Sequence, residues 1–280
     1  MNASSRYSAK SQSLGLSGIG NARELGGYEV ADGRQVRRGL LLRTAAPEGA
    51  TEADRVRLER DLKLTCVLDL RMDMERQMLK GSASPLGFAE NHVISILDQD
   101  YYARLYEGID LDKAMAASPL ERVIMGVDLG VIGETMYIGF LEAESGKCGY
   151  REVFERLLAQ PADEALLFHC TQGKDRTGLA AMLILSVLGA DDDTIVFDYL
   201  LTNTFNAALI ERERQALLAM GTAERDLDRY LIGFDMVAPA TMQRALDHLR
   251  ATYGSVWGYC RDELGVEEDG AEELRAKYLV

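Results

Sequence analysis

The chain has 280 residues, of which 47% are hydrophobic, and its 31 basic and 45 acidic side chains give a formal net charge of −14. A chain of this length and composition can bury a sizeable core, so disorder is excluded as the default state. Nucleic acids and anionic membranes both require a basic face, so we expect neither as a main partner.

The N-terminal segment, residues 1–20, is rich in Ser and Gly and has no apolar run of the kind found in signal peptides. We expect a flexible arm there, followed by a single domain over residues 21–280. The four cysteines form no CxxC pair, which indicates a reducing, cytoplasmic compartment. Export by a route that needs no signal peptide stays open. No apolar stretch is long enough for a transmembrane helix. No prediction of the oligomeric state follows from the sequence.

Short apolar runs alternate with helical patterns up to about residue 190, which predicts an α/β fold with a mostly parallel central sheet flanked by helices. Asp32-Gly33 is a hairpin turn signal. Thr51 and Asp54 have the spacing of a capping box, which predicts a helix start. The predicted strands are residues 40–42, 65–70, 93–96 and 164–168.

Helices are predicted for most of the remaining chain. Residues 99–160 are mainly helical by pattern, and the apolar segment 178–188, which stops at Gly189, predicts a buried helix. From residue 191 onward the chain is predicted to be almost wholly helical. These segments are helical additions to the α/β core.

The segment HCTQGKDRTG, residues 169–178, lies between the last predicted strand and the buried helix. A loop that joins a strand end to a helix start directs several backbone N–H groups one way, and such groups bind anions. Gly173 and Gly178 permit a tight backbone path, and the planar guanidinium of Arg176 can hold two phosphate oxygens at once. The same positive field favours the thiolate of Cys170, which is the form that attacks phosphorus.

We therefore predict a catalytic phosphate-binding loop in which Cys170 is the nucleophile, Arg176 clamps the phosphate, and Thr177 hydrogen-bonds the sulfur to help it leave. The residues predicted to bind phosphate or substrate are Thr171, Gln172, Gly173, Lys174 and Gly178. Asp175 stands where a Walker A loop requires Ser or Thr, so neither ATP nor a metal or other cofactor is implied. Two alternatives stay open: a catalytically silent phosphate-binding module and a rhodanese-like sulfurtransferase.

The HCTQGKDRTG segment resembles the signature of the protein tyrosine phosphatase superfamily, and its GKDRTG half is similar to a bacterial branch with tyrosine and dual-specificity or phosphoinositide activity. The resemblance implies the cysteine-phosphatase fold and hydrolysis of phosphate monoesters through a phosphocysteine intermediate. Phosphotyrosine in a protein is the leading substrate that it implies, with phosphoserine, phosphothreonine and phosphoinositides as further substrates. Weaker similarities occur in the family's order: NARELGGY at 21–28, GLLLRT at 39–44, LDLR at 68–71 with Glu75 after it, and YLLTN at 199–203.

A phosphatase of this class needs a general acid to protonate the leaving oxygen. No Trp-Pro-Asp occurs in the chain, and the resemblance implies that Asp175, inside the loop, does this work. Asp98, after the predicted strand at 93–96, is the alternative. The resemblance also implies phosphoinositide or dual activity from the presence of Lys174, and a helical lid over residues 204–238.

Four polar residues are expected to support the loop. His169 is predicted to hydrogen-bond backbone beneath the loop and to tune Cys170. Arg43, Asp69 and Arg71 are predicted to form a polar network at the strand ends, as structural support or as substrate contacts.

Overall fold

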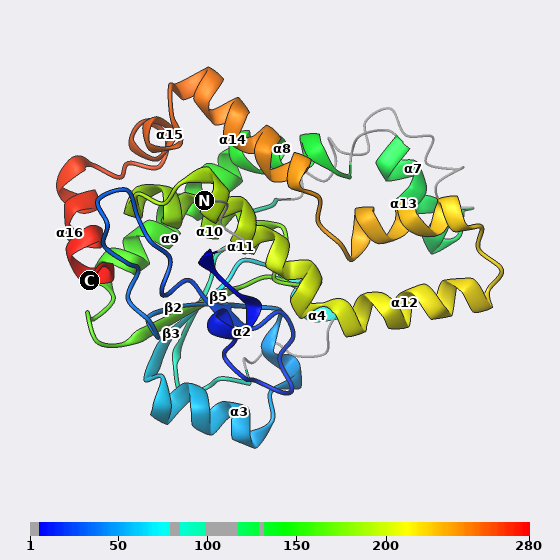
Figure 1. Ribbon diagram of the computed structural model, residues 1–280, viewed down its shortest axis with the longest axis horizontal. Coiled ribbons are helices and arrows are strands. Elements are labelled where there is room, and N and C mark those ends of the chain that lie inside the picture. The colour runs from blue at the N-terminus through cyan, green and yellow to red at the C-terminus, as the bar shows by residue number, and fades with distance from the viewer. Residues whose placement is uncertain (1–5, 79–84, 99–116, 129–131) are drawn as a thin grey trace.

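The computed structural model describes residues 6–78, 85–98, 117–128 and 132–280 (Figure 1). Its centre is a five-stranded sheet in the order β1-β2-β5-β3-β4, in which β1 is antiparallel to β2 and the other neighbours are parallel. The predicted α/β fold with a mostly parallel sheet is therefore confirmed. The strands are β1 (Arg23–Glu24), β2 (Leu41–Thr44), β3 (Leu64–Asp69), β4 (Glu90–Val93) and β5 (Ala165–His169).

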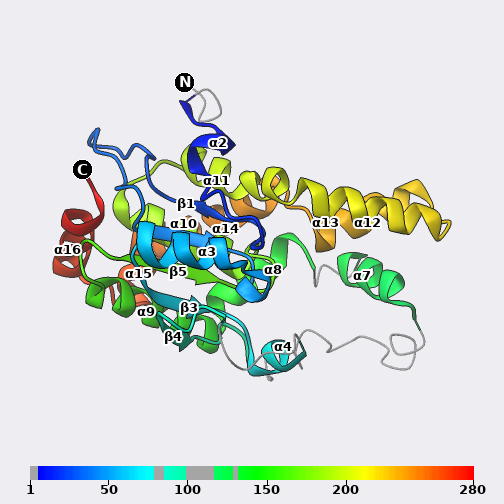
Figure 2. The ribbon, with the colours of Figure 1, turned by 90° about the horizontal axis from the view of Figure 1, so that it is seen from below.

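Helices cover both faces of the sheet and extend beyond it (Figures 1 and 2). The segments before β5 are α2 (Ala9–Gln12), η1 (Pro47–Gly49), α3 (Glu52–Val56), η2 (Arg57–Asp61), α4 (Asp73–Met78), α7 (Pro119–Asp128), α8 (Glu134–Glu142) and α9 (Glu144–Ala159). After β5 follow α10 (Arg176–Leu188), α11 (Asp192–Phe205), α12 (Ala207–Ala219), α13 (Glu224–Phe234), α14 (Pro239–Tyr253), α15 (Val256–Asp262) and α16 (Glu268–Tyr278).

The central strands bury both of their faces, as parallel strands between helical layers do. Alternate residues enter two separate cores: Leu41, Leu68 and Phe168 join the larger one, whereas Leu42 and Val67 join the smaller one. The larger core is closed by α9, α10 and α14 to α16. The smaller core lies on the face that α3 covers in Figure 1. This double burial explains why the sequence shows nearly continuous apolar runs instead of alternation.

Local predictions differ from the structure chiefly at one edge. The strand expected at 93–96 lies at Glu90–Val93, because β4 is an edge strand whose residues are mostly exposed, so an apolar run does not mark it. The buried apolar residues Ile94 and Ile96 belong to the loop that follows. The Thr51–Asp54 capping box is confirmed. The Asp32-Gly33 turn is present, with a single antiparallel bridge between Glu29 and Gln35. The predicted helix content of residues 99–116 lies outside the described residues.

Residues 6–20, which composition led us to expect as a loose arm, make specific contacts with the domain. The Gln12 side chain is fully buried and its amide donates to the backbone oxygens of Glu24 and Gly26 at 3.1 and 2.9 Å. The backbone N–H groups of Ser17 and Gly18 donate to the Asp54 carboxylate, each at 2.8 Å. This segment therefore packs against the N-terminal end of α3.

Helices α7, α12 and α13 project away from the sheet in both views (Figures 1 and 2). They share a small apolar cluster of their own, with buried Leu217, Leu227 and Leu231 packed beside Leu120 and Ile210. This cluster is separate from the two sheet cores. We call α12 and α13 the outer helix pair.

Candidate active site

The carboxyl ends of the three central strands place the predicted loop at one edge of the sheet. Thr44, Asp69 and His169 stand side by side in the register of β2, β3 and β5. Residues 170–175 then cross from the end of β5 to the start of α10. Ligands of open parallel sheets bind at this edge, because the loops that follow the strands converge there.

Gly173 is the position at which the loop passes closest to the sheet. Its φ is +67°, and a Cβ atom there would lie 2.3 Å from the backbone oxygen of Thr44. No other residue fits without moving the strand or the loop.

The carbonyl groups of the loop are held from the sheet side. The N–H of Ala46 donates to Thr171 O at 3.0 Å, and the Asn21 side-chain amide donates to Gln172 O and Gly173 O at 3.0 and 2.9 Å. In a trans peptide the C=O and the following N–H point in opposite directions. Fixing these carbonyls inward therefore turns the N–H groups of the next residues, 172 to 174, away from the scaffold, as an anion site requires.

A buried ion cluster stands behind these contacts. The carboxylate of Asp198 accepts hydrogen bonds from Arg23, Arg43 and Tyr28, and both arginine side chains are fully buried. Arg43 also donates to Gly173 O at 2.9 Å. Burial raises the pKa of Asp198, but the charges of the two arginines outweigh it and the pKa lies below its ordinary value. Burial and the neighbouring Arg43 lower the pKa of Arg23 to about 10.

The guanidinium of Arg176 is aligned by Glu75, on α4. Its Nη1 and Nη2 lie 2.5 and 2.7 Å from Oε2 and Oε1 of Glu75, a two-point pairing. Glu75 also accepts from Thr171 Oγ1 at 3.0 Å and from the N–H of Met72 at 3.0 Å. Although burial alone raises the pKa of Glu75, the hydrogen bonds and charge of Arg176 outweigh it and lower that pKa. The arginine fork is thereby held in one orientation at the loop.

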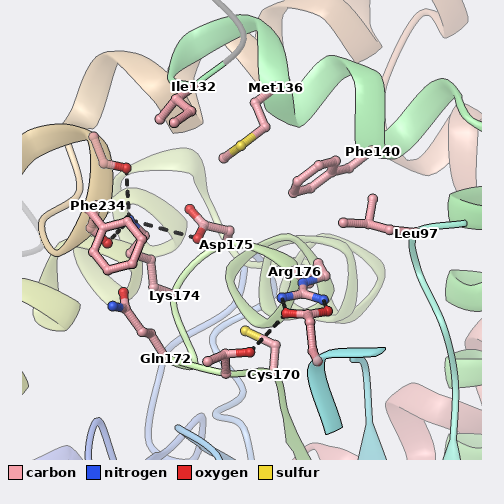
Figure 3. A pocket seen from close by; sticks show the side chains of 13 residues that line it. Leu97, Ile132, Met136, Phe140, Cys170, Gln172, Lys174, Asp175, Arg176 and Phe234 are labelled. Atoms are coloured by element: carbon pink, nitrogen blue, oxygen red, sulfur yellow. Dashed lines mark hydrogen bonds and ion pairs between the residues drawn. The ribbon is translucent and has the colours of Figure 1, made fainter. Parts of the chain in front are cut away.

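A pocket of about 300 Å³ opens over the loop (Figure 3). Cys170 and Arg176 lie at its base, and Asp175 and Lys174 lie further toward the outer helix pair. The walls are mostly apolar, and their side chains come from several elements. The apolar side chains that line the pocket are Leu97, Ile132, Met136, Phe140 and Phe234.

Asp175 has one hydrogen bond and one nearby cation at its carboxylate. Tyr137 donates to Oδ1 at 2.8 Å, and Nζ of Lys174 lies 3.8 Å from Oδ2. The hydroxyl of Tyr137 also lies 2.8 Å from that of Tyr199. Asp175 therefore lines the pocket with its carboxylate held by groups on two sides.

Lys174 turns toward the end of α13. Its ammonium lies 2.6 Å from Phe234 O, 3.4 Å from Gly233 O and 3.5 Å from Met236 O. A cation beside the last carbonyls of a helix interacts favourably with the helix dipole. A second link joins the Gln172 amide to Oδ1 of Asp235 at 3.2 Å, and burial raises the pKa of Asp235. The loop between β5 and α10 is thus connected to the outer helix pair.

The supporting residues form two groups and not the single network that we expected. Arg43 joins Asp198 and the loop, as described above. Arg71 instead pairs through two bonds of 2.8 Å with Asp69 and through one of 2.7 Å with Glu48. These pairs lie on opposite sides of β5, since β2 and β3 flank it.

His169 contacts backbone, as the sequence predicted: its Nδ1 lies 3.2 Å from Cys170 O. Because a carbonyl only accepts, Nδ1 carries the proton. Burial lowers the pKa of His169. The Thr177 hydroxyl is fully buried and makes no hydrogen bond within the described residues, so the expected bond to the Cys170 sulfur is not formed.

Asp98 lies directly after Leu97, which lines the pocket. Among the described residues, the pocket lining includes Asp175 but not Asp98. Gly178 allows the ring of Tyr199 to approach α10, since a Cβ there would lie 3.3 Å from that ring.

Sequence reasoning missed several residues of the site. Glu75, Tyr199 and Asn21 belong to segments that resemble family motifs, but the sequence offers no reason to assign a role to any of them. Asp198 directly precedes the YLLTN segment, which could have drawn attention to it. Tyr137 has no sequence signal, because only the fold brings it to Asp175.

Comparisons with known proteins agree with this geometry. The model of the tyrosine phosphatase family matches residues 14–280. A Cupriavidus necator protein named as a candidate tyrosine-protein phosphatase is 34% identical over 269 residues, which cover 95% of this chain and 88% of that protein. A Nostoc commune tyrosine-protein phosphatase is 29% identical over 172 residues, 61% of this chain and 53% of that protein. The triple specificity protein phosphatase PtpB of Mycobacterium tuberculosis is 33% identical over 125 residues, 42% of this chain and 45% of that protein.

The chain belongs to the tyrosine phosphatase family. Its enzyme class is that of a protein-tyrosine phosphatase, a phosphoric monoester hydrolase, and the family implies a phosphoprotein substrate. Within the described residues, none of the helices combines the length and hydropathy needed to span a bilayer.

Proposed function

We propose that this phosphatase acts through a phosphocysteine intermediate formed on Cys170. The thiolate attacks phosphorus, so an Sγ–P bond forms while the P–O bond to the leaving group breaks, and the leaving oxygen takes up a proton. Water then attacks phosphorus, the Sγ–P bond breaks, and inorganic phosphate leaves the restored thiolate. Dividing the reaction in this way replaces one difficult step by two easier ones.

The observation that carries the proposal is the arrangement at the base of the pocket. Cys170 and Arg176 line the same cavity, and the loop carbonyls between them are bonded to the scaffold. The loop N–H groups and the guanidinium are therefore positioned to hold the three oxygens of a phosphoryl group as charge develops on them. We assign phosphate binding to loop residues 171–174 and 178 together with Arg176.

We assign the general acid to Asp175. Its carboxyl lines the same pocket as Cys170, whereas Asp98 is not among the lining residues, and this supports Asp175 over Asp98. Asp175→Asn should slow phenyl phosphate hydrolysis more than p-nitrophenyl phosphate hydrolysis, because the better leaving group needs less protonation. The same pattern in Asp98→Asn, with Asp175→Asn unaffected, would transfer the role to Asp98.

The decisive experiment is turnover of p-nitrophenyl phosphate in EDTA by the wild type and by Cys170→Ser. We expect metal-independent hydrolysis by the wild type and none by the variant, whose circular dichroism and melting temperature stay unchanged. A folded Cys170→Ser protein with wild-type activity would exclude the mechanism. An inactive wild type would favour the silent phosphate-binding module.

Phosphotyrosine is the substrate that we place first. The apolar walls formed by Leu97, Phe140 and Phe234 suit an aromatic leaving group. We place phosphoserine, phosphothreonine and phosphoinositides after it, as dual-specificity substrates that the relationship to a triple specificity phosphatase suggests. Lys174 would have to leave the carbonyls at the end of α13 to meet a second phosphate. Rates on phosphopeptides and phosphoinositide vesicles would establish the order.

We also propose that the segment 204–238, with the outer helix pair, is a lid. Phe234 at its end lines the pocket, its apolar cluster is separate from the sheet cores, and Lys174 and Gln172 link it to the loop. A lid must open on its own, so amide hydrogen exchange should be faster in α12 and α13 than in β5 and α10. Equally slow exchange in all four elements would contradict a lid.

A further inference from the structure

Two buried tyrosines outside the loop form a hydrogen-bonded chain that ends at Asp175. Tyr137, on α8, donates to Asp175 Oδ1 at 2.8 Å, and its hydroxyl lies 2.8 Å from that of Tyr199, on α11. The two rings are packed edge to face with centroids 5.9 Å apart. Both side chains are almost fully buried, at 0% and 2% exposed.

The direction of these bonds follows from counting protons. A tyrosine hydroxyl has one proton to donate. Tyr137 gives its proton to Asp175, so the bond between the two tyrosines is donated by Tyr199. The result is a chain from Tyr199 through Tyr137 to Oδ1 of Asp175. Because Oδ1 accepts, a proton on the carboxyl is carried by Oδ2.

The environment of both tyrosines favours their neutral, proton-donating form. Burial first, and then the nearby charge of Asp175, raises the pKa of each phenol above its ordinary value. Asp175 is faced within its own loop by Lys174, whose ammonium is 3.8 Å from Oδ2. Cys170, Arg176 and Glu75 share the pocket with it.

We infer that the Tyr137–Tyr199 pair is the positioning unit of the general acid, holding Asp175 Oδ1 as an acceptor and leaving Oδ2 to protonate the leaving oxygen. The inference rests on the role proposed above for Asp175. The tyrosines do not touch the reacting atoms and act only through that carboxyl. Helix α8 supports the site twice, because its next turn also supplies Phe140 to the pocket wall.

The test measures kcat/KM of Tyr137→Phe and Tyr199→Phe with two aryl phosphates that differ in leaving group, phenyl phosphate and p-nitrophenyl phosphate. For Tyr137→Phe we expect a loss of about tenfold on phenyl phosphate and less than about threefold on p-nitrophenyl phosphate. Tyr199→Phe should show the same changes, only smaller.

Tyr278→Phe is the matched control, because its buried hydroxyl donates to Leu157 O at 3.0 Å, away from the pocket, and both rates should stay unchanged. Equal losses on both substrates would overturn the inference, since mere packing would act in that way. A Tyr137→Phe effect that persists in an Asp175→Asn background would also overturn it while leaving the general acid in place. If Asp175→Asn slowed phenyl phosphate and p-nitrophenyl phosphate equally, both the general-acid role of Asp175 and the positioning role of the tyrosine pair would be refuted.

Discussion

The two sides of the loop between β5 and α10, which we propose to bind phosphate, are held by different kinds of contact. On the sheet side, fully buried Arg43 and Asp198, together with Asn21, bind the loop carbonyls or one another. On the outer side, Lys174 and Gln172 reach the end of α13, a helix whose own apolar cluster is small. The contacts on the sheet side therefore hold the loop against displacement, whereas the outer side is attached by a few polar bonds that can be exchanged.

This difference teaches how one loop can be both rigid and accessible. Transition-state stabilisation requires hydrogen-bond donors that do not reorganise during the reaction. The buried contacts on the sheet side hold the loop backbone, and with it the loop N–H groups, in one position. The lid that we propose would give a protein-bound phosphotyrosine a movable wall at the end of α13, where Phe234 lines the pocket. Substitutions can alter one side of the loop at a time.

The largest effect is expected for Asp198→Ala, which leaves the two buried arginines without their carboxylate. Breaking a buried ion pair in this way costs about 3–5 kcal/mol, and urea unfolding should show it. Asp228→Ala on α13 is the matched control, because that carboxylate is 58% exposed and pairs with Arg214 at 3.6 Å. Its effect should stay under about 0.5 kcal/mol. Similar losses for the two variants would remove the contrast between the two sides.

Gly173→Ala should reduce kcat/KM by about a hundredfold, because the added Cβ would push the loop off Thr44 and misplace its donors. Gly221→Ala, between α12 and α13, is the control: φ is +79° there too, but no atom lies within 4 Å of the added Cβ. That variant should lose only about 1 kcal/mol of stability and keep its activity within about twofold. An active Gly173→Ala enzyme would show that the close approach to Thr44 is dispensable.

Glu75→Gln should lower kcat/KM by about tenfold, because Arg176 loses the charge that aligns it. The pKa of Glu75 in the folded protein is below its ordinary value. The ionised carboxylate therefore contributes its full stabilisation at pH values above the ordinary pKa of a glutamate. That contribution is lost as the pH falls through the lowered folded value. The difference in unfolding free energy between wild type and variant should therefore be constant near neutral pH and shrink in acid. A difference that grows toward low pH would contradict the pairing.

Lys174→Met should have the smallest effect on overall stability and act mainly on α13. We expect amide exchange in residues 224–234 to accelerate by about tenfold, with β5 unchanged. Lys277→Met is a matched control, since Lys277 also binds the last carbonyls of a helix, Leu157 O and Leu158 O at 3.3 and 2.5 Å, but far from the pocket. Acceleration in α13 from the control as well would mean that the link through Lys174 is not specific.

The fold class and the loop were predictable because both leave local patterns. Apolar runs marked β2, β3 and β5, and the residues from His169 to Gly178 are contiguous. The partners of the loop were not predictable in this way. Glu75 and Arg176 are 101 positions apart, and Tyr137 and Asp175 are 38 apart, so only the packing of α4 and α8 brings them together. The edge strand β4 was misplaced because it lacks the apolar run that marks a buried strand.

The central claim is that Cys170 carries the phosphoryl group between two chemical steps. Asp175→Asn should let p-nitrophenyl phosphate complete the first step, because this leaving group needs little protonation. It should slow the second step, in which we expect the carboxylate of Asp175, having given up its proton, to take one from the attacking water. The intermediate therefore accumulates. Acid quenching within the first turnover, followed by peptide mapping by mass spectrometry, should find the phosphoryl group on Cys170, with one nitrophenolate released per enzyme. A burst of nitrophenolate with the phosphoryl group on another residue, or on none, would contradict the account.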